Sequence, residues 1–159
     1  MKSCIFLIIL LITQISFGQD LIKSADKVDD FTGERVLNTN VVAVANGVSI
    51  GNLKFCLGRY VTKDNDMYAL NIISSKDLGC SGSNSNYIHF LFTDGTSVKY
   101  DKDQAKVDCN DINISIYVVD KNDFVNKVIS KVRFAKSSDY ADYTWTSLVS
   151  LDAFFDILK

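Results

Sequence analysis

The sequence contains no proline and only one histidine, and both shortages restrict what it can build. Without proline, tight turns depend on glycine, asparagine, aspartate and serine. Because His89 is the only histidine, a Ser/His/Asp triad or a Cys/His dyad has a single candidate for its general base. The Gly-x-Ser-x-Gly motif of a nucleophile elbow is also absent from the sequence. One histidine and dispersed cysteines also give no spaced set of four zinc ligands. We therefore interpret His89 as an ordinary strand residue, and we expect no catalytic residues, no metal site and no cofactor.

An excess of charge of one sign is also lacking. The chain has 17 Lys+Arg against 19 Asp+Glu, a net charge of −2, and the two signs are interspersed. This balance offers no electrostatic footprint for nucleic acid, so we expect no nucleic-acid partner. The aspartate-rich runs at 101–103 and 120–123 lack the glycine and glutamate of an EF-hand loop, and no glycines have phosphate-loop spacing.

The N-terminus has the layout of a secretory signal peptide. Lys2 is followed by an apolar run over residues 4–12, and the small residues Ser16 and Gly18 stand where a signal peptidase cleaves. The run is too short to span a bilayer, which disfavours the alternative of a retained membrane anchor. Cys4 stands at the start of the apolar run rather than after it, so it cannot carry a lipoprotein lipid. We expect residues 1–18 to be a signal peptide and the product to be exported, periplasmic or secreted, and not membrane-spanning.

The rest of the chain predicts a loosely ordered lead-in over residues 19–30 and a single globular domain over residues 31–159. Short alternating apolar segments dominate it, the clearest at residues 112–118. Residues 151–158 differ, because their apolar side chains recur at helical spacing after a capping Ser150. The fold class is therefore α+β and β-dominated. We expect an antiparallel sheet, sandwich- or barrel-like, of six to eight strands with a C-terminal amphipathic helix.

Two hairpin turns can be placed from local signals. The Asn-Gly dipeptide at 46–47 predicts a tight turn between apolar strands. At the second turn, an Asp-Gly loop of two residues would set Phe90 opposite Lys99. A loop of three residues, 93–95, with a left-handed glycine sets Phe90 opposite Val98 instead. The second register brings apolar residues together on one face, so we predict it.

The cysteines of the exported chain predict one disulfide. Cys80 lies fourteen residues before Asp94 and Cys109 lies fifteen after it, so a hairpin turning at Asp94 brings the two cysteines opposite each other. Disulfides persist in exported proteins. We therefore predict a Cys80–Cys109 bridge, and we predict that Cys56, in an apolar strand, is a buried free thiol.

Aromatic side chains supply the candidate binding residues. Tyr117 is on the polar parity of its predicted strand, and Tyr140, Tyr143 and Trp145 cluster before the last helix. Partly exposed aromatic rings stack on sugars or anchor protein contacts. These four residues are the possible binding surface. The competing interpretation is that they cover a second core or a sheet edge.

The N-terminal signal, the cysteines at 80 and 109 and the Asp-Gly hairpin resemble those of small exported β-rich domains of Gram-negative bacteria, a class of uncharacterised function. That resemblance implies export and a β-rich fold but no activity. The Ser-Gly-Ser loop at 81–83 is similar to the loop of periplasmic lysozyme inhibitors. These inhibitors are an example of an exported domain that acts by binding a protein target.

These observations together favour an exported non-catalytic binding or structural domain that contacts a protein partner. The alternatives are a glycan-binding module and a carboxylate-dependent hydrolase of the cell envelope. A hydrolase needs a concave cluster of at least two carboxylates, whereas a binding module needs a flat aromatic surface.

Overall fold

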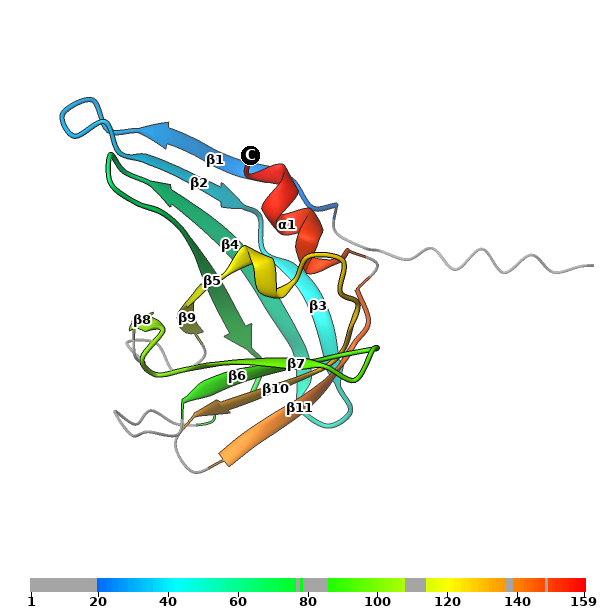
Figure 1. Cartoon of the computed structure of the whole chain (residues 1–159). Helices are drawn as coiled ribbons and strands as arrows, with labels where there is room; N and C mark the ends of the chain where they lie inside the picture. The colour runs from blue at the N-terminus through cyan, green and yellow to red at the C-terminus, as the bar shows by residue number, and fades with distance from the viewer. Residues whose placement is uncertain (1–19, 77, 79–85, 108–113, 137–138, 148) are drawn as a thin grey trace, which may run out of the picture.

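The computed structural model describes residues 20–76, 78, 86–107, 114–136, 139–147 and 149–159. Eleven strands, one 3-10 helix and one α-helix lie in these ranges (Figure 1). The elements are β1 (Lys23–Val28), β2 (Arg35–Thr39), β3 (Val42–Gly47), β4 (Gly51–Val61), β5 (Asp66–Ser74), β6 (Tyr87–Phe92), β7 (Ser97–Asp101), β8 (Ala105–Val107), β9 (Ile114–Val119), η1 (Lys121–Asp123), β10 (Ile129–Lys136), β11 (Asp139–Trp145) and α1 (Leu151–Ile157).

The strands form one curved antiparallel sheet in the order β7-β6-β10-β11-β3-β4-β5-β9-β8. The 11-residue strand β4 has different neighbours along one edge, because β3 pairs with its first half and β2 with its second half. Strand β1 pairs antiparallel with β2. The described ladders leave β7 and β8 as the two ends of the main order, so the sheet is not closed into a barrel. This confirms the β-dominated antiparallel α+β class, with more strands than the six to eight expected.

The hairpin of β6 and β7 has the register chosen from the sequence. Phe90 lies opposite Val98, and Ile88 lies opposite Tyr100. Gly95 has φ +84°, the left-handed conformation that a three-residue loop requires. The Phe92 N–H donates to the Thr96 carbonyl at 2.9 Å and closes the loop.

The hairpin of β3 and β4 turns later than the Asn-Gly dipeptide predicted. The last pair of the ladder is Gly47 opposite Gly51, so residues 48–50 make the loop. Gly51 takes the left-handed conformation, with φ +77°, and the Ile50 N–H donates to the Gly47 carbonyl at 3.1 Å. A three-residue loop followed by a left-handed glycine replaces the two-residue turn, because Gly51 can take the positive φ that this loop requires.

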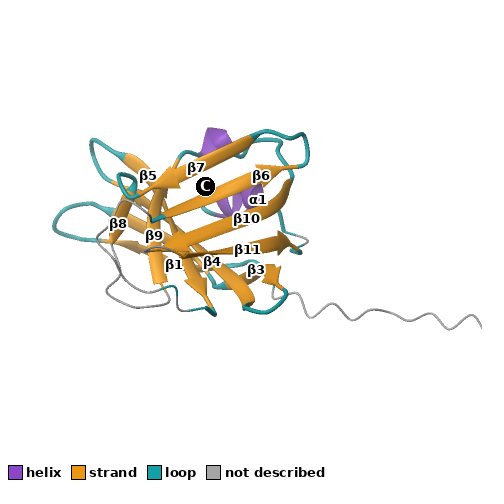
Figure 2. Cartoon of the chain, turned by 90° about the horizontal axis from the view of Figure 1, so that it is seen from below, coloured by secondary structure: helices purple, strands orange, loops and turns teal. Residues whose placement is uncertain are grey.

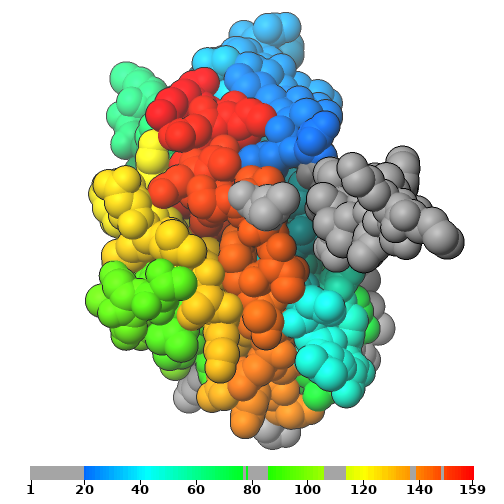
Figure 3. Space-filling view, turned by 90° about the vertical axis from the view of Figure 1, so that its right-hand side faces the viewer, coloured from blue at the N-terminus to red at the C-terminus, as the bar shows by residue number. Residues whose placement is uncertain are grey.

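The concave side of the sheet is filled by aromatic side chains and covered by α1. Phe124, in the segment after η1, packs against Phe90 and Phe155 at centroid distances of 5.1 and 5.9 Å. Phe155 of α1 also meets Tyr68 of β5 at 4.9 Å. The Ser150 side chain accepts the Ala153 N–H and caps the helix as predicted. Figure 3 shows α1 (red) at the surface beside the N-terminal strands (blue).

After β9 the chain forms the short 3-10 turn η1, capped by Asp120, and Phe124 turns into the core behind it. One local expectation is corrected. Residues 23–28, expected to be part of a loosely ordered lead-in, form β1 instead. Almost all of β1 is exposed on both faces, so its sequence carries no alternating pattern.

Within the described ranges, no helix has the length and apolar character needed to cross a membrane.

Candidate functional site

A band of polar and aromatic side chains crosses the convex face of β7, β6, β10 and β11. These strands lie side by side in Figure 2, with α1 behind them. The strand registers align Lys99, His89, Arg133 and Asp142 in one row, one residue from each strand. The neighbouring positions of the same face hold Tyr87, Leu91, Lys131 and Tyr140. We call these eight residues the basic face.

The basic face is held in place by its own contacts. Arg133 donates to both carboxylate oxygens of Asp142, from Nε at 2.6 Å and from Nη2 at 2.7 Å. The same guanidinium lies 4.2 Å from the ring centre of Tyr140, and the Lys99 ammonium lies 4.5 Å from that of Tyr87. A bidentate ion pair with a stacked guanidinium fixes long side chains that would otherwise be mobile.

The electrostatics of the basic face are positive at its centre. Partial burial, together with the charges of Lys99 and Arg133, lowers the pKa of His89 below its ordinary value. Hydrogen bonds from Arg133 lower the pKa of Asp142 and keep that carboxyl ionised. Although the carboxylate of Asp142 is paired with Arg133, the positive charges of Lys99 and Arg133 still lower the pKa of His89. A positive region therefore remains on a chain whose net charge is −2.

A small hollow of about 210 Å³ lies within the basic face. Leu91 supplies its exposed apolar side chain, and His89, Lys131, Arg133 and Asp142 supply its polar rim. Leu91 is exposed, as is Tyr140 with 49% of its surface accessible. Exposed apolar and aromatic groups beside fixed charges are the usual composition of a protein contact surface.

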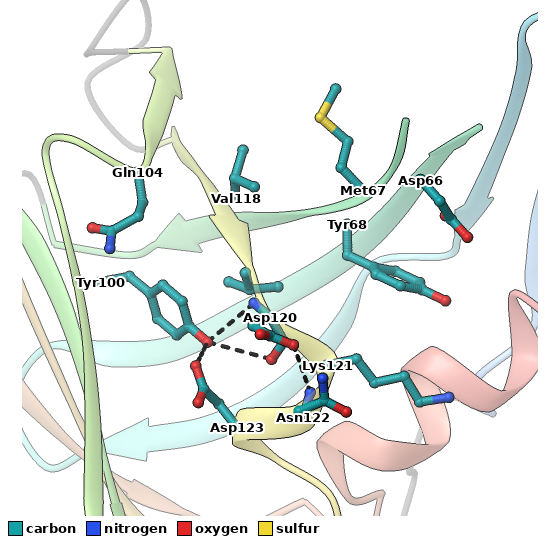
Figure 4. Close-up of a pocket in the computed structure, with 11 residues that line it drawn as sticks. Asp66, Met67, Tyr68, Tyr100, Gln104, Val118, Asp120, Lys121, Asn122 and Asp123 are labelled. Carbon is teal, nitrogen blue, oxygen red and sulfur yellow. Dashed lines mark hydrogen bonds between the residues drawn. The ribbon is translucent and has the colours of Figure 1, made fainter. Parts of the chain in front are cut away.

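A second, larger groove of about 620 Å³ lies between β5, β7 and the segment after β9 (Figure 4). Three carboxylates line it, and each already has a structural partner. Asp66 accepts two hydrogen bonds from Arg59, at 2.9 and 2.7 Å. Asp120 caps η1 by accepting the Asn122 N–H at 2.8 Å, and Asp123 accepts the hydroxyl of Tyr100.

These partners determine what the groove can do chemically. The hydrogen bonds from Arg59 lower the pKa of Asp66, whereas a glycosidase acid needs a raised one. Burial and the hydrogen bond to Asp123 raise the pKa of Tyr100, so its hydroxyl stays protonated and serves as a donor. Among the described residues, no group of three His, Cys, Asp or Glu side chains is arranged to hold a metal ion. The carboxylates of the groove thus hold the fold together.

The four aromatic residues proposed from the sequence do not form one surface. Tyr117 and Tyr143 are buried, with 0% and 1% of their surface accessible, which corrects their assignment to a binding surface. The Tyr143 hydroxyl is 2.7 Å from that of Ser74 inside the sheet. Trp145 is partly buried and packs 5.9 Å from Phe55. Tyr140 alone of the four lies on the basic face.

Tyr117 is buried because β9 has the opposite orientation to that predicted from its pattern. Its inward side chains are Ser115, Tyr117 and Val119, while Ile114 and Ile116 are only half-buried. An aromatic ring fills more of a curved interior than a branched aliphatic side chain does. The strict alternation therefore identified the strand correctly but not the face that is buried.

The predicted Cys80–Cys109 disulfide lies outside the described residues and stays a prediction. Along the described chain, the β6–β7 ladder ends with Tyr87 opposite Asp101, and the chain then turns to form β8 beside β9. Cys56 is a free, half-buried thiol that donates to the Thr39 carbonyl at 3.1 Å. Burial raises the pKa of Cys56, so this thiol is a poor nucleophile.

Sequence reasoning missed most of the basic face. The alternation of Lys131 and Arg133 with Val132 and Phe134 is typical of a strand with one polar side, and it is the one local signal of this face. The missing information was the strand order, because only the insertion of β6 between β7 and β10 aligns Lys99 with Arg133.

Comparisons with known proteins add no family. No family model matches the chain, and neither the curated proteins nor the solved structures give a match. The functional argument therefore depends on the geometry of the chain itself.

Proposed function

We propose that this chain is an exported, non-catalytic binding domain that contacts a protein partner through the basic face. The observation that supports the proposal is the row of Lys99, His89, Arg133 and Asp142 beside exposed Leu91 and Tyr140. Arginine and tyrosine are enriched where proteins bind one another, and the ordering cost of binding is smaller when the side chains are already fixed.

The contacts of the tyrosines favour a protein partner over a glycan. Sugars stack on open aromatic faces, but a cation already covers one face of Tyr140 and one face of Tyr87. Mixed charge, an arginine and exposed apolar atoms are better suited to a polypeptide surface. The hydrolase alternative has weaker support, since all three carboxylates of the groove are engaged with neighbouring groups.

A capture experiment with charge-reversed variants tests the proposal. The purified protein is immobilised and exposed to envelope extract, beside a K99E/K131E double variant of the basic face. A K54E/K63E double variant serves as the matched control. It changes the net charge by the same amount at two exposed lysines that do not belong to the basic face. Circular dichroism establishes that all three are folded.

A protein captured by the wild type and by K54E/K63E, but retained at least about tenfold less by K99E/K131E, supports the proposal. Equal capture by all three variants contradicts it. Specific binding on a glycan array that K99E/K131E leaves unchanged would instead favour the glycan-binding alternative.

A further inference from the structure

The turn between β1 and β2 displays one aromatic ring almost entirely to solvent. Phe31 is 98% exposed, the most exposed of the large apolar side chains in the described ranges. Figure 1 shows this turn projecting beyond the body of the sheet at the upper left. Val28, at the end of β1, is also exposed and extends the apolar tip.

The backbone under Phe31 is held by a small hydrogen-bond network. One oxygen of the Asp29 carboxylate accepts the N–H groups of Phe31 and Thr32, at 2.9 and 2.8 Å. The Asp29 N–H donates to the Glu34 carbonyl at 2.8 Å, and Gly33, in the left-handed conformation with φ +71°, donates to the Asp29 carbonyl. The ring is thus presented by an ordered turn, so the backbone loses little freedom when the ring binds.

The tip around Phe31 is acidic. Asp29, Asp30 and Glu34 flank the ring within three residues on either side. The nearest arginine, Arg35, is already paired with Asp26 at 2.6 Å. A binding site for this tip therefore needs an apolar hollow with a positive rim.

The basic face of the same chain has these properties. Its hollow of about 210 Å³ is larger than the roughly 150 Å³ cavity that suffices to hold a benzene ring. Leu91 offers the apolar wall, and His89, Lys131 and Arg133 lie around it together with Asp142. Because Arg133 already balances the charge of Asp142, the unpaired positive charge of the rim comes from Lys131. The projecting ring with its acidic neighbours and the hollow with its positive rim are therefore complementary in shape and in charge.

We propose that the partner of the basic face is a second copy of this chain, whose Phe31 enters the hollow beside Leu91 while Asp30 and Glu34 face Lys131 and His89. This inference depends on the proposed function, which makes the basic face a protein-binding surface. The turn projects at the upper left in Figure 1, whereas the strands that carry the basic face lie at the bottom of that view and are seen from below in Figure 2. The tip and the hollow therefore lie at different ends of the molecule. The contact is therefore head-to-tail and leaves one tip and one hollow free at the ends of each chain of copies.

Sedimentation velocity over about 10 µM to about 1 mM protein tests the inference, since a single inserted ring gives weak association in this range. The wild type is expected to associate with rising concentration, and less so at high salt. F31A is expected to weaken association at least about tenfold. The matched control is V48A, which truncates an apolar side chain that is 95% exposed at the tip of the β3–β4 hairpin and should change nothing.

Mixing two defective variants tests the head-to-tail geometry. F31A keeps its hollow, and K131E keeps its tip, so each alone should stay monomeric while an equimolar mixture forms one-to-one dimers that do not grow. A wild type that stays monomeric at every concentration overturns the inference, and so does an F31A variant that associates like the wild type. If the wild type is monomeric but K99E/K131E has still lost a captured envelope protein, the basic face binds a different protein and only the self-association is refuted.

Discussion

Phe124 is the residue whose loss we expect to destabilise the fold most clearly. Its ring is 1% exposed and meets four aromatic rings, with centroid distances of 5.1 Å to Phe90, 6.0 Å to Phe92, 6.1 Å to Tyr100 and 5.9 Å to Phe155. These rings come from β6, β7 and α1, so Phe124 joins the sheet to the helix. Since three of the four neighbours are fixed on strands, the space left by truncation cannot collapse easily.

The expected loss follows from this packing. Phe→Ala substitutions in cores cost about 3–5 kcal/mol, and F124A should fall in the upper part of this range because the cavity persists. F124L retains most of the apolar volume and should cost about 1–2 kcal/mol. V125A is the control, because Val125 is exposed at the next position and its truncation should change the free energy of unfolding by less than about 0.5 kcal/mol.

Urea unfolding followed by the fluorescence of Trp145, the only tryptophan, measures these differences. The reasoning is refuted if F124A loses less than about 1 kcal/mol, since the aromatic cluster would then not be packed as described. If F124A does not fold, F124L decides the question: it must be less stable than V125A.

Three further predictions concern the N-terminal segment, the cysteines and the histidine. The intact mass of the exported product should show the loss of residues 1–18, and a mature chain that retains them would contradict the signal peptide. The denatured, unreduced exported chain should contain one free thiol, at Cys56. Three free thiols would exclude the bridge, and replacing both Cys80 and Cys109 by serine should cost about 2–4 kcal/mol if it exists. Because the pKa of His89 is lowered by folding, the unfolded chain binds the proton more readily, so stability should fall as the pH drops below the ordinary value of 6.5. H89Q should remove this part of the pH dependence, and an unchanged profile would show that His89 is not its source.

Local sequence signals predicted the elements whose partners are close along the chain. The register of Phe90 opposite Val98 follows from one loop and from pairing apolar residues, both of which are readable in a short window. The last helix was equally readable, since Ser150 and the apolar spacing after it decide the cap and the buried face together.

Long-range arrangement decided what the sequence could not predict. The burial of Tyr117 rather than Ile116 depends on which side of β9 faces the aromatic interior, and that interior is assembled from distant strands. Strand β1 pairs with β2 yet buries little, so it leaves no periodic signal. The basic face needed the order β7-β6-β10-β11, which no local pattern specifies.

The junction between β11 and β3 has a consequence for how the chain folds. Among the described residues, the ladder between β11 and β3 has two registered pairs, Thr144 with Asn46 and Trp145 with Ala45, and it connects the four strands of the basic face to the rest of the sheet. Each pair joins positions roughly a hundred residues apart, and such distant closures make folding slow. The sheet therefore cannot be completed until residue 145 has left the ribosome. Until then, the edges of β3 and β11 stay open to wrong partners.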